Sequence, residues 1–234
     1  MTASGVPTAG RVTKEWAAEF PGFDVWRSLR LLRRIGPVVQ GICLDRTTGG
    51  DGYVPTAHVH ALTREFPVVS LMLGQRAARP SGTPDPVLFA RHERDFAHAV
   101  GALREQSRLP LDEPPSIDAI VREYHAEARR RLEKGHGAAV PEMEDSVLVA
   151  AAAGRDELAG EGLVLARELT AAWPKWSMPL EWPGAEAWLD GLAARAGDRE
   201  SLRAVVRGQA TAHRLGKVRD HLFPDDTRNH MSAP

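Results

Sequence analysis

The chain has little cysteine, little lysine and no long apolar run. Cys43 is the only cysteine, so no disulfide can form within the chain, which favours a reducing compartment. No stretch approaches the roughly 20 apolar residues that cross a bilayer, and the N-terminus lacks the apolar core of a signal peptide. We therefore expect a soluble, cytoplasmic protein without a membrane partner.

Positive charge comes almost entirely from arginine. Lysine and arginine together number 30, yet lysine occurs only at positions 14, 134, 175 and 217. The coding bias of a GC-rich genome explains this imbalance, and selection for bidentate contacts with anions is the functional alternative. The formal net charge is −1, so no global field would draw the chain to nucleic acid. Nucleic-acid binding would need arginines from several helices to converge.

Sequence signatures of known chemistry are also missing. The chain contains no His-Glu-x-x-His, Cys-x-x-Cys or Asp-x-Asp motif. Ser70 and Ser146 lack the Gly-x-Ser-x-Gly or Ser-x-x-Lys pattern of a serine nucleophile, so we select neither as catalytic. The glycine-rich stretch 47–52 lacks the Lys-Ser/Thr of a phosphate loop and is interpreted as a hairpin loop. Cys43 lies in an apolar segment and is expected to be a buried, inert thiol.

Three short segments in the N-terminal third predict a small antiparallel sheet. We expect strands over 38–45, 53–62 and 66–73. The first of them is apolar on both sides, which is typical of a central strand. The links between the segments are too short for a crossover, so neighbouring strands should run antiparallel.

The middle segment carries Thr56, His58 and His60 at alternate positions. In a strand these side chains share one face, so two imidazoles could converge on one Zn²⁺. A catalytic zinc site needs a third protein ligand, and the spacing selects none. The alternative is a pair of half-buried histidines that are hydrogen-bonded to their neighbours.

Helical periodicity governs most of the remaining sequence, apart from a Pro- and Gly-containing loop at 75–86. In and just after the helix expected from Asp24 to Leu32, four arginine side chains are expected to point outward into solvent: Arg27, Arg30, Arg33 and Arg34. Helices are expected over 13–20, from Asp24 to Leu32, from Asp85 to Leu103 and from Ser116 to Leu132. A further helical stretch is expected from Asp145 or Ser146 to Trp173, with a break at Gly154. The last two helices are expected over 185–196 and over 201–222, and Asp198 is the expected cap of the second.

Four of the six tryptophans lie in one proline-interrupted segment near the C-terminal third: Trp173, Trp176, Trp182 and Trp188. The prolines prevent this segment from forming one helix. An indole offers a large apolar face and one N–H group, so such a segment suits a partner-docking surface. The alternative is a long connection that its own indoles fix onto the helical core.

Three acidic residues cluster where we expect a helix to begin: Glu142, Glu144 and Asp145. Negative charge at that position stabilises the helix dipole, so we interpret the cluster as structural and not as an acid–base pair.

Taken together, these patterns predict an α+β protein. We expect a small antiparallel sheet of about three strands near the N-terminus, packed against a mainly helical C-terminal part. A single globular domain over 11–234 is favoured, with a possible subdivision into a β-containing part at 11–76 and a helical part at 85–223. The ends 1–10 and 225–234 are expected to be flexible.

For function, we favour a cytoplasmic accessory protein that binds, regulates or neutralises a protein partner without catalysis or a cofactor of its own. The four tryptophans are the candidate partner surface. The alternative is a metal-dependent hydrolase in which His58 and His60 hold zinc and a metal-bound water is the nucleophile.

Overall fold

The computed structural model describes residues 6–222, and the chain divides into two compact units. Among the described residues, the first unit combines 6–59, 74–114 and 215–222, and the second combines 60–73 with 115–214. Each unit is therefore assembled from separate stretches of sequence. The single domain expected over 11–234 stays a prediction. The expected flexible end 225–234 lies outside the described residues, and within 1–10 the first helix already begins at Ala9.

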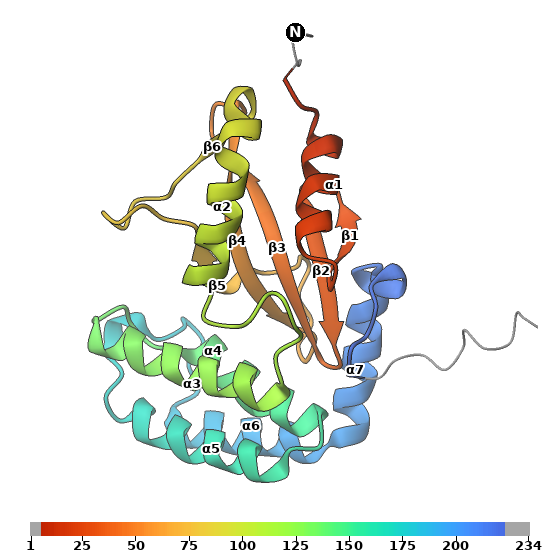
Figure 1. The fold of residues 1–234 in the computed structure, drawn as a ribbon. Coiled ribbons are helices and arrows are strands. Elements are labelled where there is room, and N and C mark those ends of the chain that lie inside the picture. Colours follow the sequence, from red (N-terminus) through yellow and green to blue (C-terminus); the bar gives the residue numbers. More distant parts are fainter. Residues whose placement is uncertain (1–5, 223–234) are drawn as a thin grey trace, which may run out of the picture. The chain divides into compact units, whose positions relative to one another are not determined.

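The expected α+β class is confirmed, but the sheet is larger than about three strands. Six strands form one sheet in the order β1-β2-β3-β4-β5, and β6 pairs with β4 (Figure 1). Strand β2 pairs antiparallel with both β1 and β3, and β6 pairs antiparallel with β4. The strands are β1 Asp24–Arg27, β2 Arg30–Ile35, β3 Val38–Arg46, β4 Gly52–Ala61, β5 Met72–Arg76 and β6 Val87–Leu88.

The helix expected from Asp24 to Leu32 is wrong, because β1 and β2 form a hairpin there. Its turn holds Leu29 at a φ of 61°, and the Leu29 N–H donates to Thr13 Oγ1 at 2.8 Å. Strand β2 pairs with β3 along its whole length, from Arg30 opposite Cys43 to Ile35 opposite Val38. This long pairing buries apolar side chains on both faces of β2, which outweighs the local helical spacing.

Two further boundaries differ from the predicted ones. The third strand was expected over 66–73, but β5 begins at Met72 and residues 66–71 have no regular structure. Val87 and Leu88 pair with β4 instead of opening a helix at Asp85, so helix α2 begins only at His92 and extends to Gln106. Pairing with a buried strand explains this shift, because Val87 itself is buried in the core.

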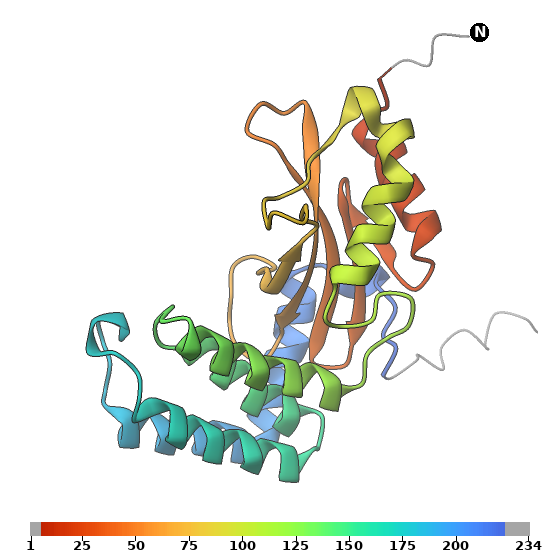
Figure 2. The same cartoon turned by 60° about the vertical axis from the view of Figure 1, so that its left-hand side comes forward.

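Helices α1 (Ala9–Glu19) and α2 cover the same face of the sheet in the first unit (Figures 1 and 2). Trp16 of α1 is fully buried there and stacks on Phe20 at a centroid distance of 5.9 Å. The same core receives Ile42 from β3 and Leu103 from α2. Apolar burial on one face of the sheet is therefore the main stabilising term in this unit.

Arg33 does not point outward as expected, because its side chain is fully buried and its guanidinium contacts the segment 110–113. It donates twice to Gln40 Oε1, at 2.8 and 2.6 Å, and to the carbonyl oxygens of Pro110 and Leu111 at 2.7 and 3.1 Å. Burial lowers the pKa of Arg33 to about 10, so it stays charged at neutral pH. The hydrogen bonds compensate the burial of this charge and hold the segment on strand β2.

The second unit is built on a buried central helix, α4 (Val140–Ala152), which contacts four other helices (Figure 2). They are α3 (Ile117–Glu133), α5 (Asp156–Thr170), α6 (Ala185–Gly197) and α7 (Arg199–Ala212). The predicted caps Ser116 and Asp198 are confirmed, since each side chain accepts a backbone N–H of its own helix. Helix α4 begins five residues before Asp145, and α7 ends ten residues before Leu222, so both predicted bounds are wrong. No helix within 6–222 combines the length and apolarity that a membrane span requires.

Gly41 in β3 provides a test of core packing in the first unit. A Cβ at this position would lie 2.3 Å from His58 Nε2 and 2.7 Å from Leu32 Cδ2. We expect Gly41→Ala to lower the free energy of unfolding by about 2 kcal/mol through overpacking. Urea unfolding followed by circular dichroism measures this change.

Gly101→Ala is the matched control, because a Cβ there would meet no atom within 4 Å. Since Gly101 lies inside α2, alanine should stabilise the protein by about 0.5–1 kcal/mol. A Gly41→Ala protein as stable as the wild type would contradict the packing described for β3.

Candidate functional site

A cavity of about 150 Å³ in the second unit brings together four polar side chains that are separate in sequence. These are His60, Arg64, Ser70 and Asp145. The rest of the wall is apolar and comes from Ala61, Phe66, Met72 and Pro141. A mostly apolar cavity with a few convergent polar groups is the common form of a small-molecule site.

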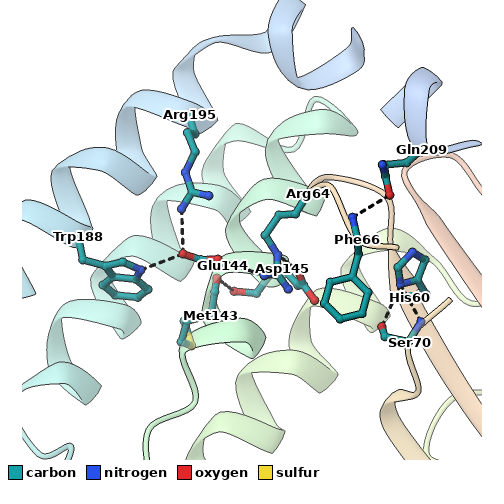
Figure 3. Close-up of polar contacts among 11 residues, drawn as sticks. His60, Arg64, Phe66, Ser70, Met143, Glu144, Asp145, Trp188, Arg195 and Gln209 are labelled. Atoms are coloured by element: carbon teal, nitrogen blue, oxygen red, sulfur yellow. Dashed lines mark hydrogen bonds and ion pairs between the residues drawn. The ribbon is translucent and has the colours of Figure 1, made fainter. Parts of the chain in front are cut away.

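His60 and Ser70 form a hydrogen-bonded pair on one side of this cavity (Figure 3). Ser70 Oγ lies 2.9 Å from His60 Nδ1, and the backbone N–H of Ser70 also points at Nδ1, at 3.2 Å. A backbone N–H can only donate, so Nδ1 is an acceptor and the neutral ring carries its proton on Nε2. The Ser70 hydroxyl is then the donor to Nδ1.

Arg64 and Asp145 form an ion pair on the other side of the cavity. Arg64 Nε lies 2.8 Å from Asp145 Oδ1, and Arg64 Nη1 lies 3.4 Å from Glu144 Oε2. The Asp145 side chain is only 2% exposed. Burial raises the pKa of Asp145 to about 6, against the attraction of Arg64. The cavity therefore has a charged wall that is sensitive to protonation near neutral pH.

Glu144 links this ion pair to the tryptophan-rich part of the unit (Figure 3). Its Oε1 accepts hydrogen bonds from Trp188 Nε1 and Arg195 Nη2, both at 3.0 Å. The acidic cluster was interpreted as stabilising a helix start, and Glu142 does lie in the first turn of α4. Asp145 and Glu144 lie further along the helix, where their partners are side chains from other segments.

Three of the four predicted partner-surface tryptophans pack against one another. The ring centroids of Trp173, Trp182 and Trp188 are separated by 5.5 to 6.2 Å in every pair. Trp173 and Trp188 are buried, whereas Trp176 is 76% exposed. Part of the segment therefore forms a packed cluster and part of it faces solvent, and the partner surface stays a prediction.

The exposed stretch is fixed at its centre by Ser177. The Ser177 hydroxyl donates to the Pro174 carbonyl at 2.8 Å and accepts from the Ala138 N–H at 2.9 Å. Gly137 allows this approach, because a Cβ there would lie 2.8 Å from Ser177 Cβ. Trp176 thus projects from a segment that is anchored at both ends by the packed indoles and in the middle by Ser177.

The strand predicted around the His-x-His pair is present. Strand β4 includes Thr56, His58 and His60, and all three side chains are buried. His58 belongs to the first unit and His60 to the second. Over residues 6–222, no group of three or more His, Cys, Asp or Glu side chains is placed to hold a metal ion. Zinc binding by this pair stays a prediction.

Two other titratable groups are core residues: Cys43, as expected, and His92. Cys43 is fully buried, and its thiol lies 2.6 Å from Asp45 Oδ1. His92 is 1% exposed and lies between the Tyr53 hydroxyl, at 2.8 Å from Nδ1, and Glu15. Burial raises the pKa of Tyr53 well above its usual value, so this hydroxyl stays protonated at neutral pH. These contacts satisfy buried polar groups and stabilise the first unit.

Comparison with known proteins gives no match to a protein-family model, a curated protein or a solved structure.

The buried ion pair generates a prediction with a defined pH dependence. The pKa of Asp145 is raised in the folded state, so its burial penalises folding fully above about pH 6 and not below about pH 4. Arg64→Leu removes the compensating charge and raises this pKa further. We expect a loss of about 3 kcal/mol in the free energy of unfolding at pH 8. The loss should become smaller at pH 5, where the carboxyl group of the variant is protonated. Urea unfolding at both pH values measures it.

Arg195→Leu is the matched control, because Arg195 also binds an acid of α4 but is 45% exposed. Its loss should stay below about 1 kcal/mol at both pH values. Equal losses for Arg64→Leu at pH 5 and pH 8 would show that the destabilisation does not come from the Asp145 charge.

Proposed function

We propose that the protein is a partner-binding accessory protein that recognises another protein through Trp176 and Leu180. The observation that carries this proposal is the exposure of both side chains. Trp176 is 76% exposed and Leu180 is 104% exposed, within five residues of each other. Large exposed apolar side chains close together are typical of interaction surfaces, and tryptophan is enriched at binding hot spots.

Anchoring of the segment supports the proposal. The packed indoles of Trp173, Trp182 and Trp188 flank the exposed stretch on both sides, and Ser177 fixes its centre. A surface that is already ordered loses little conformational entropy when a partner binds. The arrangement therefore favours recognition by a preformed surface.

The chemistry of the surface indicates which partner groups it suits. The open indole face of Trp176 suits an arginine side chain or an apolar side chain of the partner. Lys175 and Glu181 flank the apolar pair with one charge of each sign, and both are exposed. An apolar centre with a mixed polar rim is the usual composition of a protein–protein interface.

Trp176→Ala tests the proposal without disturbing the packed indoles. Because Trp176 is mostly exposed, the variant should unfold within about 0.5 kcal/mol of the wild type. Loss of a hot-spot tryptophan should weaken partner binding at least tenfold, about 1.4 kcal/mol or more. Immobilised wild type and variant are compared by quantitative mass spectrometry of bound proteins from the native cell extract, followed by titration of each protein that differs.

Val164→Ala is the matched control, because Val164 is 62% exposed on α5 and lies outside the tryptophan-rich segment. It should retain all partners of the wild type. Identical partner sets for wild type, Trp176→Ala and Leu180→Ala would overturn the proposal.

A further inference from the structure

The pair formed by His60 and Ser70 is more than the buried polar contact that its sequence suggests. We propose that Ser70 is a nucleophile activated by His60, and that the adjoining cavity accepts the acyl group of a small ester or thioester. The pair lies 2.9 Å apart within the cavity wall, which is within the reach required between a nucleophile and its general base. This site is separate from the Trp176 surface and does not depend on the proposed partner.

The direction of the hydrogen bond is the first argument. The backbone N–H of Ser70 forces His60 Nδ1 to be an acceptor, so the Ser70 hydroxyl directs its proton at the same lone pair. A serine placed in this way can transfer its proton to the imidazole while its oxygen attacks. A serine that accepted a hydrogen bond from the ring would have no base available.

The cavity is the second argument, because it places space beside Ser70. A volume of about 150 Å³ is comparable to that of an apolar cavity that holds benzene. Phe66 and Met72 provide apolar wall, and Phe66 is also 42% exposed, so it borders the route to solvent. These features suit a short acyl chain or a phenyl group as the part of the substrate that enters the cavity.

Arg64 is the third argument, because it brings a permanently charged guanidinium to the same cavity. Negative charge develops on the carbonyl oxygen when a serine attacks an ester, and a cation in a largely apolar cavity stabilises that charge. Asp145 holds Arg64 in place through Nε at 2.8 Å. Asp145 is therefore a positioning residue here, whereas Ser70 and His60 would make the bond and move the proton, and Arg64 would stabilise the charge on the carbonyl oxygen.

The proposed reaction is a conventional acyl transfer. Ser70 Oγ forms a bond to the carbonyl carbon, its proton passes to His60 Nδ1, and the carbonyl π electrons move to the oxygen. Collapse of this adduct breaks the bond to the leaving alcohol or thiol, which takes the proton from His60. Water then attacks the acyl-serine with His60 as base, which releases a carboxylic acid and restores the serine.

Phenylmethylsulfonyl fluoride tests the reactivity of Ser70 in the wild-type protein. Attack on sulfur forms a sulfonyl-serine and releases fluoride and the serine proton. We expect one adduct, located at Ser70 by peptide mass spectrometry. Labelling should be at least about 100-fold faster than at the exposed Ser81, which provides an unactivated reference in the same sample. Ser70→Ala should also abolish hydrolysis of p-nitrophenyl acetate.

Two variants complete the test. His60→Gln should lose the labelling of Ser70, and circular dichroism shows whether it is folded. Ser146→Ala should be labelled like the wild type, because the Ser146 hydroxyl donates to the Met143 carbonyl inside the core. A wild-type protein that gives no adduct at Ser70, or that reacts equally at Ser70 and Ser81, would overturn the proposal whatever the variants do. Trp176→Ala should label normally, which keeps this result independent of the partner surface.

Discussion

The buried ion pair between Arg64 and Asp145 is the constraint on which the organisation of the second unit depends. It joins the segment 60–73 to the central helix α4, across 81 positions of sequence. A carboxylate that is 2% exposed is tolerated in the core only because a cation lies beside it. The same pair forms one wall of the cavity. Its neighbour Glu144 continues the network to Trp188, so a single turn of α4 connects the cavity wall to the indole cluster.

Much of the fold could be predicted from the sequence because it is encoded locally. The caps at Ser116 and Asp198 and the buried thiol of Cys43 each follow from a residue and its immediate neighbours. The β1–β2 hairpin could not be predicted in this way. Its residues have helical spacing, and only pairing with β3 makes the strand favourable. Arg33 illustrates the same limit, because its carbonyl partners come from residues 110–113, far along the chain.

The candidate site was less predictable than the fold for the same physical reason. Ser70 and His60 are ten residues apart and belong to no motif, so nothing in the sequence distinguishes this serine from an ordinary loop residue. Their pairing arises because residues 62–71 return to strand β4 without forming the expected strand over 66–73. Asp145 was assigned a role at a helix terminus because the true start of α4, at Val140, follows Ala139 and precedes Pro141, with no side-chain cap to mark it.

The tryptophan-rich segment contains both packed and exposed indoles. Trp173, Trp182 and Trp188 bury apolar surface in mutual contact, which accounts for the stability of a proline-interrupted connection. Trp176 and Leu180 add nothing comparable to that packing, since most of each side chain remains in water. If the segment served only to cover the helical core, polar residues at these two positions would stabilise it equally well and would keep the chain more soluble. The exposure of this pair therefore supports the proposed partner surface.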